Sequence, residues 1–491
     1  MYTFFICLLV LVVGYYFYSR YVERVFGADP TRETPAVAMA DGVDYIGLPW
    51  WRIFLIQFLN IAGLGPIFGA IAGAMWGPVA FLWIVLGSLI GGGVHDYFSG
   101  MLSVRNKGKS LPEMTGKYLG EGSRKFTMVF TVTVLILVGA VFIAGPAKLM
   151  SDLTLGDSGI NSMFTIQFWT LLILAYYILA TMLPIDKIIG KLYPIFGLAL
   201  LLMAILVFVT ILFHEVEIPE LTMATLTNMH HGGSDFPIFP MLFITIACGA
   251  VSGFHATQSP IMARCITNEK QGRRIFYGAM ITEAVVAMIW AAVSMSFFGG
   301  VSQLNEIMVA ENGNAAFVVN AVSSGLLGGI GIVLVTLGVV VAPITSGDTA
   351  FRGARIIIAD FFNWEQKKLV PRILTSIPLL AIGYSLTLMD FSVLWRYFAW
   401  ANQTIAAITL WMVTVYLLQE NKNYWVALVP AMFMTAVSVS YIMVAPEGFQ
   451  LPITISVWGG IIAAFAVFAL LFKTRRYAIG TSAKVPYNKP G

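Results

Sequence analysis

Charged residues are scarce in this sequence: Asp, Glu, Lys and Arg together make up 11% of its 491 positions, against roughly 25% in soluble domains. Hydrophobic residues make up 58%, and the mean hydropathy is +0.82. Apolar stretches of about 20 residues recur along the chain, and none alternates with the period of a barrel strand. The composition therefore predicts a helical integral membrane protein without a separate soluble catalytic or nucleic-acid-binding domain.

Cysteines and recognised reaction motifs are also lacking. Only Cys7, Cys248 and Cys265 occur, and their positions in or beside apolar stretches predict no disulfide framework. The sequence has no nucleotide-binding loop, no HExxH zinc motif and no recognisable nucleophile motif. These absences argue against ATP-driven transport by this chain alone and against a membrane-embedded metal-dependent hydrolase.

Thirteen apolar stretches are long enough to cross a bilayer. They are 2–19, 53–75, 78–104, 126–149, 163–183, 190–213, 238–262, 276–299, 326–347, 371–389, 393–417, 424–444 and 453–473. Connections rich in lysine and arginine alternate with the connections 214–237, 301–317 and 445–452, which contain neither residue. Because basic loops stay in the cytoplasm, this alternation predicts an outside N-terminus and a cytoplasmic C-terminus. The segment ARIIIADFFNWEQKK at 354–368 has the pattern of an additional helix on the membrane surface.

The second stretch, IFLIQFLNIAGLGPIFGAIAGAM, carries Gly63, Gly65 and Pro66 at its middle. Proline lacks an N–H and clashes with the preceding turn, and glycine weakens a helix. Within a bilayer, unwound backbone is tolerated only where it is buried in protein or lines a cavity. The stretch is therefore either kinked for close helix packing or opened around a substrate cavity.

The seventh stretch, 238–262, is interrupted by Gly249, Ser252, Gly253 and Pro260, and it lies five spans after the first interrupted stretch. Since five is odd, the two stretches cross the membrane in opposite directions. This is the pattern of an inverted repeat in which the first helix of each five-helix unit is discontinuous. The matching positions favour the substrate-cavity interpretation of both interruptions.

The predicted organisation is a single membrane domain, since no linker divides the chain. It comprises an N-terminal helix with a cytoplasmic loop at 1–52, a first five-helix repeat at 53–213, an external loop at 214–237, a second, inverted five-helix repeat at 238–417, and two accessory helices with a cytoplasmic tail at 418–491.

Several long motifs are similar to those of a known family. The stretches FGADPTRETPAVAMADGVDY, GLGPIFGAIAGAMWG, GGGVHDYFSG, GFHATQSPIMARCITNE and APITSGDTAFRGARIIIAD resemble the carbon-starvation (CstA) family of bacterial inner-membrane transporters. The resemblance runs from about residue 20 to residue 420. It implies a LeuT-like fold and uptake of short peptides or pyruvate, driven by a proton or other cation gradient. The chain has fewer spans near its C-terminal end than the longest family members, which concerns accessory helices and not the ten-helix core.

Several ionisable residues of the spans share a depth. His95, Asp96, His255, Glu283 and Asp348 all fall in the predicted cytoplasmic third of the membrane. Each such residue costs roughly 2.5–3.5 kcal/mol at the bilayer centre unless it is satisfied. Three interpretations stay open: a structural hydrogen-bond network, coupling of transport to a proton or other cation, and a divalent-metal site at His95, Asp96 and His255.

Neutral polar residues near the interruptions are candidates for binding a solute. Asn60, Asn402 and Gln403 can hydrogen-bond amide or carboxylate groups, or else a neighbouring helix. The predicted substrate site comprises Asn60, Gly63, Gly65, Gly249, Ser252, Gly253, Asn402 and Gln403. The family resemblance adds Thr345 and Ser346 as candidate sodium ligands, although helix packing or capping also accounts for them.

The sequence therefore predicts a secondary active transporter in the lipid bilayer, not an enzyme, for a small anionic or zwitterionic solute. The family resemblance implies that this solute is a short peptide or pyruvate. A bound cation, which is a proton, a sodium ion or a divalent metal, is the one cofactor that the pattern indicates. An ion channel is the alternative, with the run Gly91-Gly92-Gly93 as a pore loop. That run lies inside a long span and lacks a filter-like flanking pattern.

Overall fold

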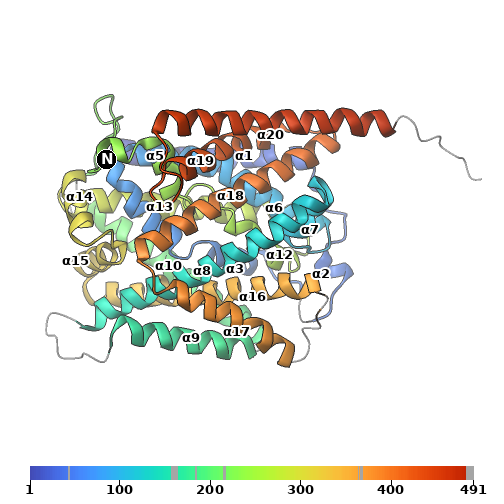
Figure 1. Ribbon diagram of the computed structural model, residues 1–491. Coiled ribbons are helices and arrows are strands. Elements are labelled where there is room, and N and C mark those ends of the chain that lie inside the picture. Colours follow the sequence, from blue (N-terminus) through green and yellow to red (C-terminus); the bar gives the residue numbers. More distant parts are fainter. Residues whose placement is uncertain are drawn as a thin grey trace, which may run out of the picture.

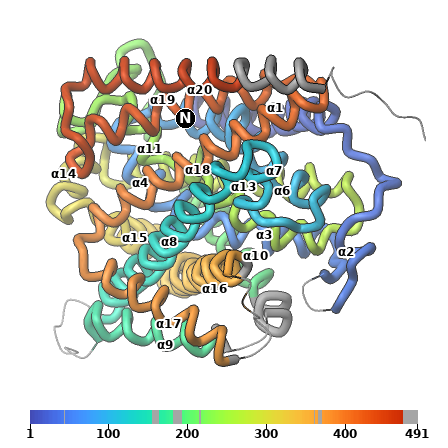
Figure 2. The backbone as a smooth tube through the Cα atoms, turned by 45° about the vertical axis from the view of Figure 1, so that its right-hand side comes forward, coloured from blue at the N-terminus to red at the C-terminus, as the bar shows by residue number. Residues whose placement is uncertain are grey.

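In the computed structural model, every regular element is a helix among the residues that the structure describes (Figure 1). These residues are 1–42, 45–155, 164–182, 185–213, 217–362, 364 and 369–482. The helices form one bundle in which α19 (Trp425–Val444) and α20 (Ile453–Ser482) lie side by side along one edge. The helices α9 (Ile166–Met182) and α17 (Leu369–Leu386) lie along the opposite edge (Figures 1 and 2).

Nine helices in the described part of the chain are long and apolar enough to cross a membrane, or ten if the bent pair Trp50–Ile61 and Gly65–Trp76 is one span. Two shorter apolar helices, Ile166–Ala180 and Val370–Leu386, fall on two further predicted spans. The remaining predicted span, 238–262, is divided into short helical pieces. The all-helical polytopic class is confirmed, while length and apolarity support nine or ten spans of the predicted thirteen.

Burial separates the core helices from those at the edge of the bundle. In the span that contains α13 (Gly278–Phe297), 89% of the most apolar 18-residue segment is buried inside the protein. The corresponding fractions are 22% for α1 (Tyr2–Phe26) and 17% for Ile453–Leu471. Exposed apolar side chains such as Ile6 and Ile462 cover these two outer helices. A continuous apolar surface of this kind fits contact with lipid.

The described part of the bundle contains five further long helices. They are α8 (Glu121–Leu155), α10 (Ile185–Phe213), α15 (Ala315–Val335), α16 (Ala342–Phe362) and α18 (Phe391–Gln419). Of these, α10 and α15 contact α13. The third predicted span is continuous from Val79 to Arg105 and ends in α6 (Gly93–Arg105).

The glycine run in the third span serves close packing. A Cβ atom at Gly91 would lie 2.6 Å from Cγ2 of Val251, and one at Gly92 would overlap the carbonyl of Ala250. Because the run is helical and packs directly against the second interrupted span, its glycines account for a close helix contact. The pore-loop interpretation of this run is therefore wrong.

The predicted surface helix is also wrong over residues 354–362, because α16 continues from the ninth span without a break. Ala350 and Ala354 are fully buried on this helix, and Arg355 is 5% exposed. Their spacing places one face of the helix against its neighbours, α8 among them. The rest of the predicted surface helix, apart from Trp364, lies outside the described residues.

Candidate functional site

The first interrupted span is broken at the glycines and the proline. The helix α3 (Trp50–Ile61) ends before Gly63, and helical structure resumes at η1 (Gly65–Gly69). The two halves meet at an angle of 55°. Pro66 stands in the first turn of the second half, where its missing N–H costs no hydrogen bond and its fixed φ suits a helix start. The sequence thus separates two half-helices inside the bundle.

The second interrupted span is broken between two helical pieces. The short elements η5 (Ile238–Leu242) and α11 (Phe243–Thr245) precede the break, and α12 (Phe254–Ala263) follows it. Gly249, Ser252 and Gly253 all lie in the non-helical stretch or at its end. Pro260 lies inside α12, so the glycines and not this proline mark the break.

Asn402 of α18 fills the second break. Its side-chain oxygen accepts a hydrogen bond from the N–H of Phe254 at 2.6 Å, and its NH₂ group donates to the Ser252 hydroxyl at 3.0 Å. The N–H of Gly253 donates to the backbone carbonyl of Asn402 at 3.2 Å. Three predicted substrate ligands therefore bind one another, and Asn402 satisfies backbone groups that the break leaves free.

The glycines of both breaks are close-packing positions. A Cβ at Gly65 would overlap Cys248, so the two broken spans touch directly at their interruptions. The other three predicted glycines are enclosed in the same way: a Cβ would meet Ala287 at Gly249, Phe142 at Gly63 and the α18 backbone at Gly253. In this structure the breaks are therefore closed against each other and against neighbouring helices.

Amide side chains beside the breaks keep polar atoms without a hydrogen bond. Asn60 is 1% exposed and Gln57 is fully buried, and neither side-chain amide has a partner among the described residues. Gln403 donates from Nε2 to the Phe243 carbonyl at 3.1 Å, while its Oε1 has no such partner. Leaving a buried polar group unpaired costs about 1–3 kcal/mol. These amides are therefore suited to binding a polar ligand that enters between the helices.

A cavity of about 350 Å³ begins beside the first break. Aromatic rings dominate its wall, and its polar side chains include an arginine and two histidines. Its lining includes Phe68, Trp76, His230, His231, Phe236, Phe391, Trp395 and Arg396. Sequence reasoning missed this cavity because its wall combines segments that are far apart in the chain.

The charge state of His230 and the ion-pair partner of Arg396 describe the polar part of the cavity. Burial, together with neighbouring His231, lowers the pKa of His230 to about 4, so this imidazole is neutral near pH 7. Arg396 is 35% exposed, and its Nε lies 3.2 Å from a carboxylate oxygen of Glu447. The cavity thus presents one partly accessible guanidinium among aromatic rings.

Four of the five predicted ionisable residues meet in a buried cluster, which we call the Asp96 cluster: His95, Asp96, His255 and Glu283. Asp96 holds the Nδ1 of His95 at 2.7 Å with one carboxylate oxygen and the Nδ1 of His255 at 2.8 Å with the other. The Nε2 of His255 lies 3.3 Å from Oε2 of Glu283. All four side chains are fully buried.

The shared carboxylate fixes how protons are placed in this cluster. An ionised carboxylate only accepts hydrogen bonds, so Asp96 requires a proton on the Nδ1 of both histidines. In neutral His255 the Nε2 lone pair then faces the Glu283 carboxylate. Two electron-rich atoms at 3.3 Å repel each other unless a cation lies between them. The arrangement is therefore suited to holding a proton or a metal ion at this point.

The group of side chains that can hold a metal ion differs from the predicted one. Sγ of Cys248, a ring nitrogen of His255 and a carboxylate oxygen of Glu283 lie within 4.8 Å of one another. His95 and Asp96, which were predicted as ligands, instead meet through the Nδ1 side of the histidines. Sequence reasoning missed Cys248 because a single cysteine in an apolar stretch resembles an ordinary buried residue.

The remaining coupling candidates lie on α16 and contact other partners. Asp348 forms an ion pair with Arg352 at 3.1 Å, one turn along the same helix. Ser346 donates to the carbonyl of Leu59 at 3.2 Å, which brings α16 against the end of α3 at the first break. The Thr345 hydroxyl donates to the carbonyl of Ala342 within its own helix. The hydroxyls therefore lie near the first break, and Asp348 has a partner of its own.

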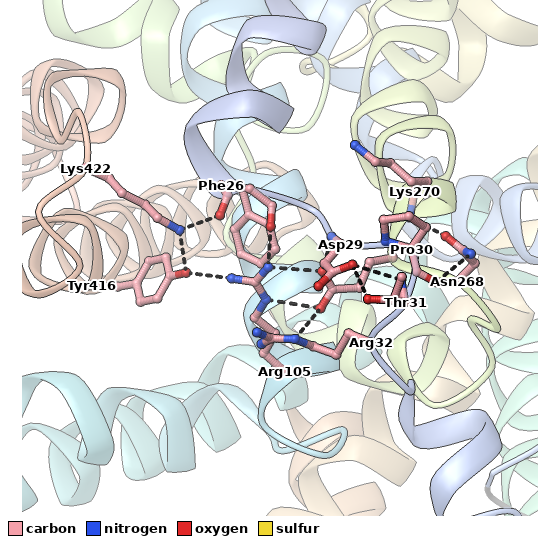
Figure 3. A network of polar contacts seen from close by, with 12 residues as sticks. Phe26, Asp29, Pro30, Thr31, Arg32, Arg105, Asn268, Lys270, Tyr416 and Lys422 are labelled. Atoms are coloured by element: carbon pink, nitrogen blue, oxygen red, sulfur yellow. Dashed lines mark hydrogen bonds and ion pairs between the residues drawn. The ribbon is translucent and has the colours of Figure 1, made fainter.

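A second polar network lies at the end of the bundle away from the aromatic cavity (Figure 3). Arg105 donates to both carboxylate oxygens of buried Glu269, at 3.1 and 3.0 Å, and to the Tyr416 hydroxyl at 3.1 Å. Glu269 also accepts from the N–H of Asp29 at 2.8 Å. Lys422 donates to the Phe26 carbonyl at 2.5 Å. This network joins the loop after α1 to α6 and α18, among residues of the predicted cytoplasmic loops.

Comparisons with known proteins agree with this architecture. The structure is similar to the crystal structure of MhsT in complex with L-phenylalanine, with a TM-score of 0.56 at 14% identity over 86% of this chain and 98% of that one. MhsT has the LeuT fold, and a likeness at this identity concerns the fold alone.

Relatives found by sequence have a higher percentage of identical residues. The chain is 44% identical to an "uncharacterized membrane protein" of Haemophilus influenzae, over 62% of this chain and 94% of that one. It is 26% identical to the "peptide transporter CstA" of Escherichia coli K12, over 87% and 78% of the two chains. It is 29% identical to the "pyruvate/proton symporter BtsT" of the same organism, over 57% and 47%. The alignment thus spans about half the length of that symporter.

The family described as "carbon starvation protein CstA" matches residues 1–168, 157–326 and 301–441. These matches cover most of the sequence, including both broken spans and the Asp96 cluster. The chain belongs to the carbon starvation CstA family.

Proposed function

We propose that the protein is a secondary active transporter that takes up a short peptide or pyruvate across the bacterial inner membrane. The observation that carries this proposal is the direct meeting of two broken helices beside the unpaired amides of Asn60 and Gln57. Discontinuous helices inside the membrane are the binding elements of inverted-repeat transporters. The printed names of relatives, a peptide transporter and a pyruvate/proton symporter, support the two substrate classes.

The proposed topology has thirteen spans, with the N-terminus outside and the C-terminus in the cytoplasm. Residues 53–213 and 238–417 form two inverted five-helix repeats, joined by the external loop 214–237. The segments 1–52 and 418–491 are accessory. The matching places of the two breaks and the restriction of lysine and arginine to alternate loops support this arrangement.

The cavity beside the first break is the proposed entrance for substrate. Its aromatic wall fits apolar parts of a peptide, and the partly exposed guanidinium of Arg396 fits a carboxylate, which peptides and pyruvate share. Phe68, in the second half of the first broken span, belongs to the wall. Movement of that half-helix opens a path from the cavity to Asn60 and Gln57.

Coupling to a cation is the proposed role of the Asp96 cluster. His95 and Asp96 belong to the first repeat, whereas His255 and Glu283 belong to the second. The 2.8 Å contact between Asp96 and His255 therefore joins the repeats, and their relative movement changes it. A proton held between His255 and Glu283 in one arrangement is released in another. The region of Ser346 and Thr345 is the proposed place for a sodium ion, should sodium be the driving ion.

Uptake into proteoliposomes tests the proposed function. Labelled pyruvate, dipeptides and tripeptides are offered under an imposed proton or sodium gradient. We expect one substrate class to accumulate above its external concentration under one gradient, and to exchange with unlabelled substrate inside. Flux that only follows the substrate's own gradient, without counterflow, would instead establish a channel.

A further inference from the structure

Three different ligand atoms converge at one buried point in the second repeat. Sγ of Cys248, a ring nitrogen of His255 and a carboxylate oxygen of Glu283 lie within 4.8 Å of one another. Cys248 is 3% exposed, and the other two side chains are fully buried. Neither Nε2 of His255 nor either Glu283 oxygen has a hydrogen-bond partner within the described residues. Unpaired atoms of this kind require a ligand or carry a large energetic cost.

The surroundings of His255 prepare its Nε2 as a ligand atom. Asp96 holds the opposite ring nitrogen at 2.8 Å, which fixes the tautomer that leaves the Nε2 lone pair free. A carboxylate that orients a histidine from behind in this way is the usual partner of a metal-binding imidazole. The free Nε2 then faces Glu283.

Two hydrogen-bond donors lie beside the sulfur of Cys248. The Asn402 NH₂ group lies 3.5 Å from Sγ and the Ser252 hydroxyl lies 3.6 Å from it, and both are donors. A metal ion binds cysteine as the thiolate and releases the thiol proton, and both donors can then hydrogen-bond the charged sulfur. A proton between His255 and Glu283 would satisfy those two residues, yet it would give the sulfur no role.

We propose that Cys248, His255 and Glu283 bind one divalent metal ion of borderline softness, such as Zn²⁺. One thiolate, one neutral imidazole and one carboxylate form a ligand set typical of this ion class. The negative charges of the thiolate and of the Glu283 carboxylate balance the charge of the ion, and the Asp96 carboxylate lies behind His255. The ion joins the second break to α13 and occupies the place of the proposed coupling proton. A metal ion and a proton would compete for this place, so the inference bears on the proposed coupling role, but metal binding can be measured without transport.

Metal content and the spectrum of the cobalt form test this site. Full-length protein is purified from cells grown with added Co²⁺, so that the site fills as the chain folds. We expect about one Co²⁺ per chain and an absorption band from thiolate-to-cobalt charge transfer. Cys248→Ser should lose the band, and Cys248→Ser and Glu283→Gln should each lower retained cobalt at least about tenfold. Cys265→Ser and Cys7→Ser, which change the other two cysteines, should keep both signals.

Two results would overturn the metal site. One is wild-type protein that elutes as a single folded species without stoichiometric cobalt or zinc, and the other is a charge-transfer band that persists in Cys248→Ser. The transport assay is judged separately. Metal-free wild-type protein that accumulates substrate would remove this inference and keep the proposed function, whereas loaded protein without any uptake would do the reverse.

Discussion

Glu283 is the residue on which the chemistry of the Asp96 cluster depends most directly. Its carboxylate is fully buried and faces the free nitrogen of His255 at 3.3 Å. If the coupling cation is a proton, Glu283→Gln should abolish accumulation against a gradient and preserve substrate exchange, since exchange does not require release of the proton. Proteoliposomes measured in both modes check this expectation.

The control for that variant is Glu306→Gln, which neutralises an exposed carboxylate on α14 (Val301–Ala310) and should change neither mode. A purely structural network predicts a different outcome. In that case Glu283→Gln would lower thermal stability, and the protein that survives would still concentrate its substrate.

Asn402 gives a second residue-scale prediction, on stability. Asn402→Ala removes the acceptor for the Phe254 N–H and the donor to Ser252. The break then keeps unpaired buried groups, so we expect a loss of about 1–3 kcal/mol in the free energy of unfolding. Thermal unfolding of the purified protein measures it. Gln303→Ala, at an exposed position of α14, should leave the melting temperature unchanged. If Gln303→Ala destabilised the protein as much as Asn402→Ala, the loss could not be assigned to the Asn402 hydrogen bonds.

The cluster residues could be predicted because ionisable side chains inside apolar spans are costly and therefore rare. Depth alone, however, does not determine contact. Asp348 shares the predicted depth but pairs with Arg352, and their spacing of four residues was a readable signal for that pair. Cys248 had no such signal, because its role depends on atoms contributed by α12, α13 and α18.

The two broken helices belong to the next scale, that of elements. Gly65→Leu places a large side chain where even a Cβ would overlap Cys248. We expect this variant to reach the membrane and to lose uptake, because the half-helices can no longer close against each other. Membrane fractionation and proteoliposome uptake measure the two effects.

The matched control is Gly122→Leu, at an exposed position near the start of α8 where an added Cβ meets no atom within 4 Å. It should express and transport normally. Normal transport by Gly65→Leu would show that the first interruption is only a kink.

Both breaks could be predicted because glycine and proline act on the local backbone, which the sequence displays directly. The end of the ninth span could not be predicted, because the charged residues in 354–362 resemble those of a surface helix. In the structure, the alanines of α16 allow close packing, and Arg352 and Arg355 are buried beside them. The thirteen-span prediction also counted interrupted and short helices as full spans. Among the described residues, nine or ten helices are long and apolar enough to cross a membrane.

At the scale of the whole molecule, the orientation in the membrane is the prediction to test. Ser234 and Lys270 are both exposed and lie in connections predicted on opposite sides. With the native cysteines replaced, a cysteine at 234 should react with an impermeant thiol reagent in intact cells, and one at 270 only after lysis. Labelling of position 270 alone from outside would reverse the orientation, whereas labelling of both positions from outside would remove the crossing between them and with it the inverted repeat.

The network around Glu269 has a consequence for the rate of the transport cycle. It lies at the end of the bundle near α7 (Leu111–Leu119), whereas the aromatic cavity lies at the end near α14 (Figure 1). An opening at the α7 end would break the contacts of buried Glu269 with Arg105 and with the Asp29 N–H, which is costly for a buried charge. In the proposed orientation the α7 end faces the cytoplasm, so we expect its opening to limit the cycle. Saturating uptake into proteoliposomes should then speed up in Glu269→Gln, while the half-saturating concentration changes little.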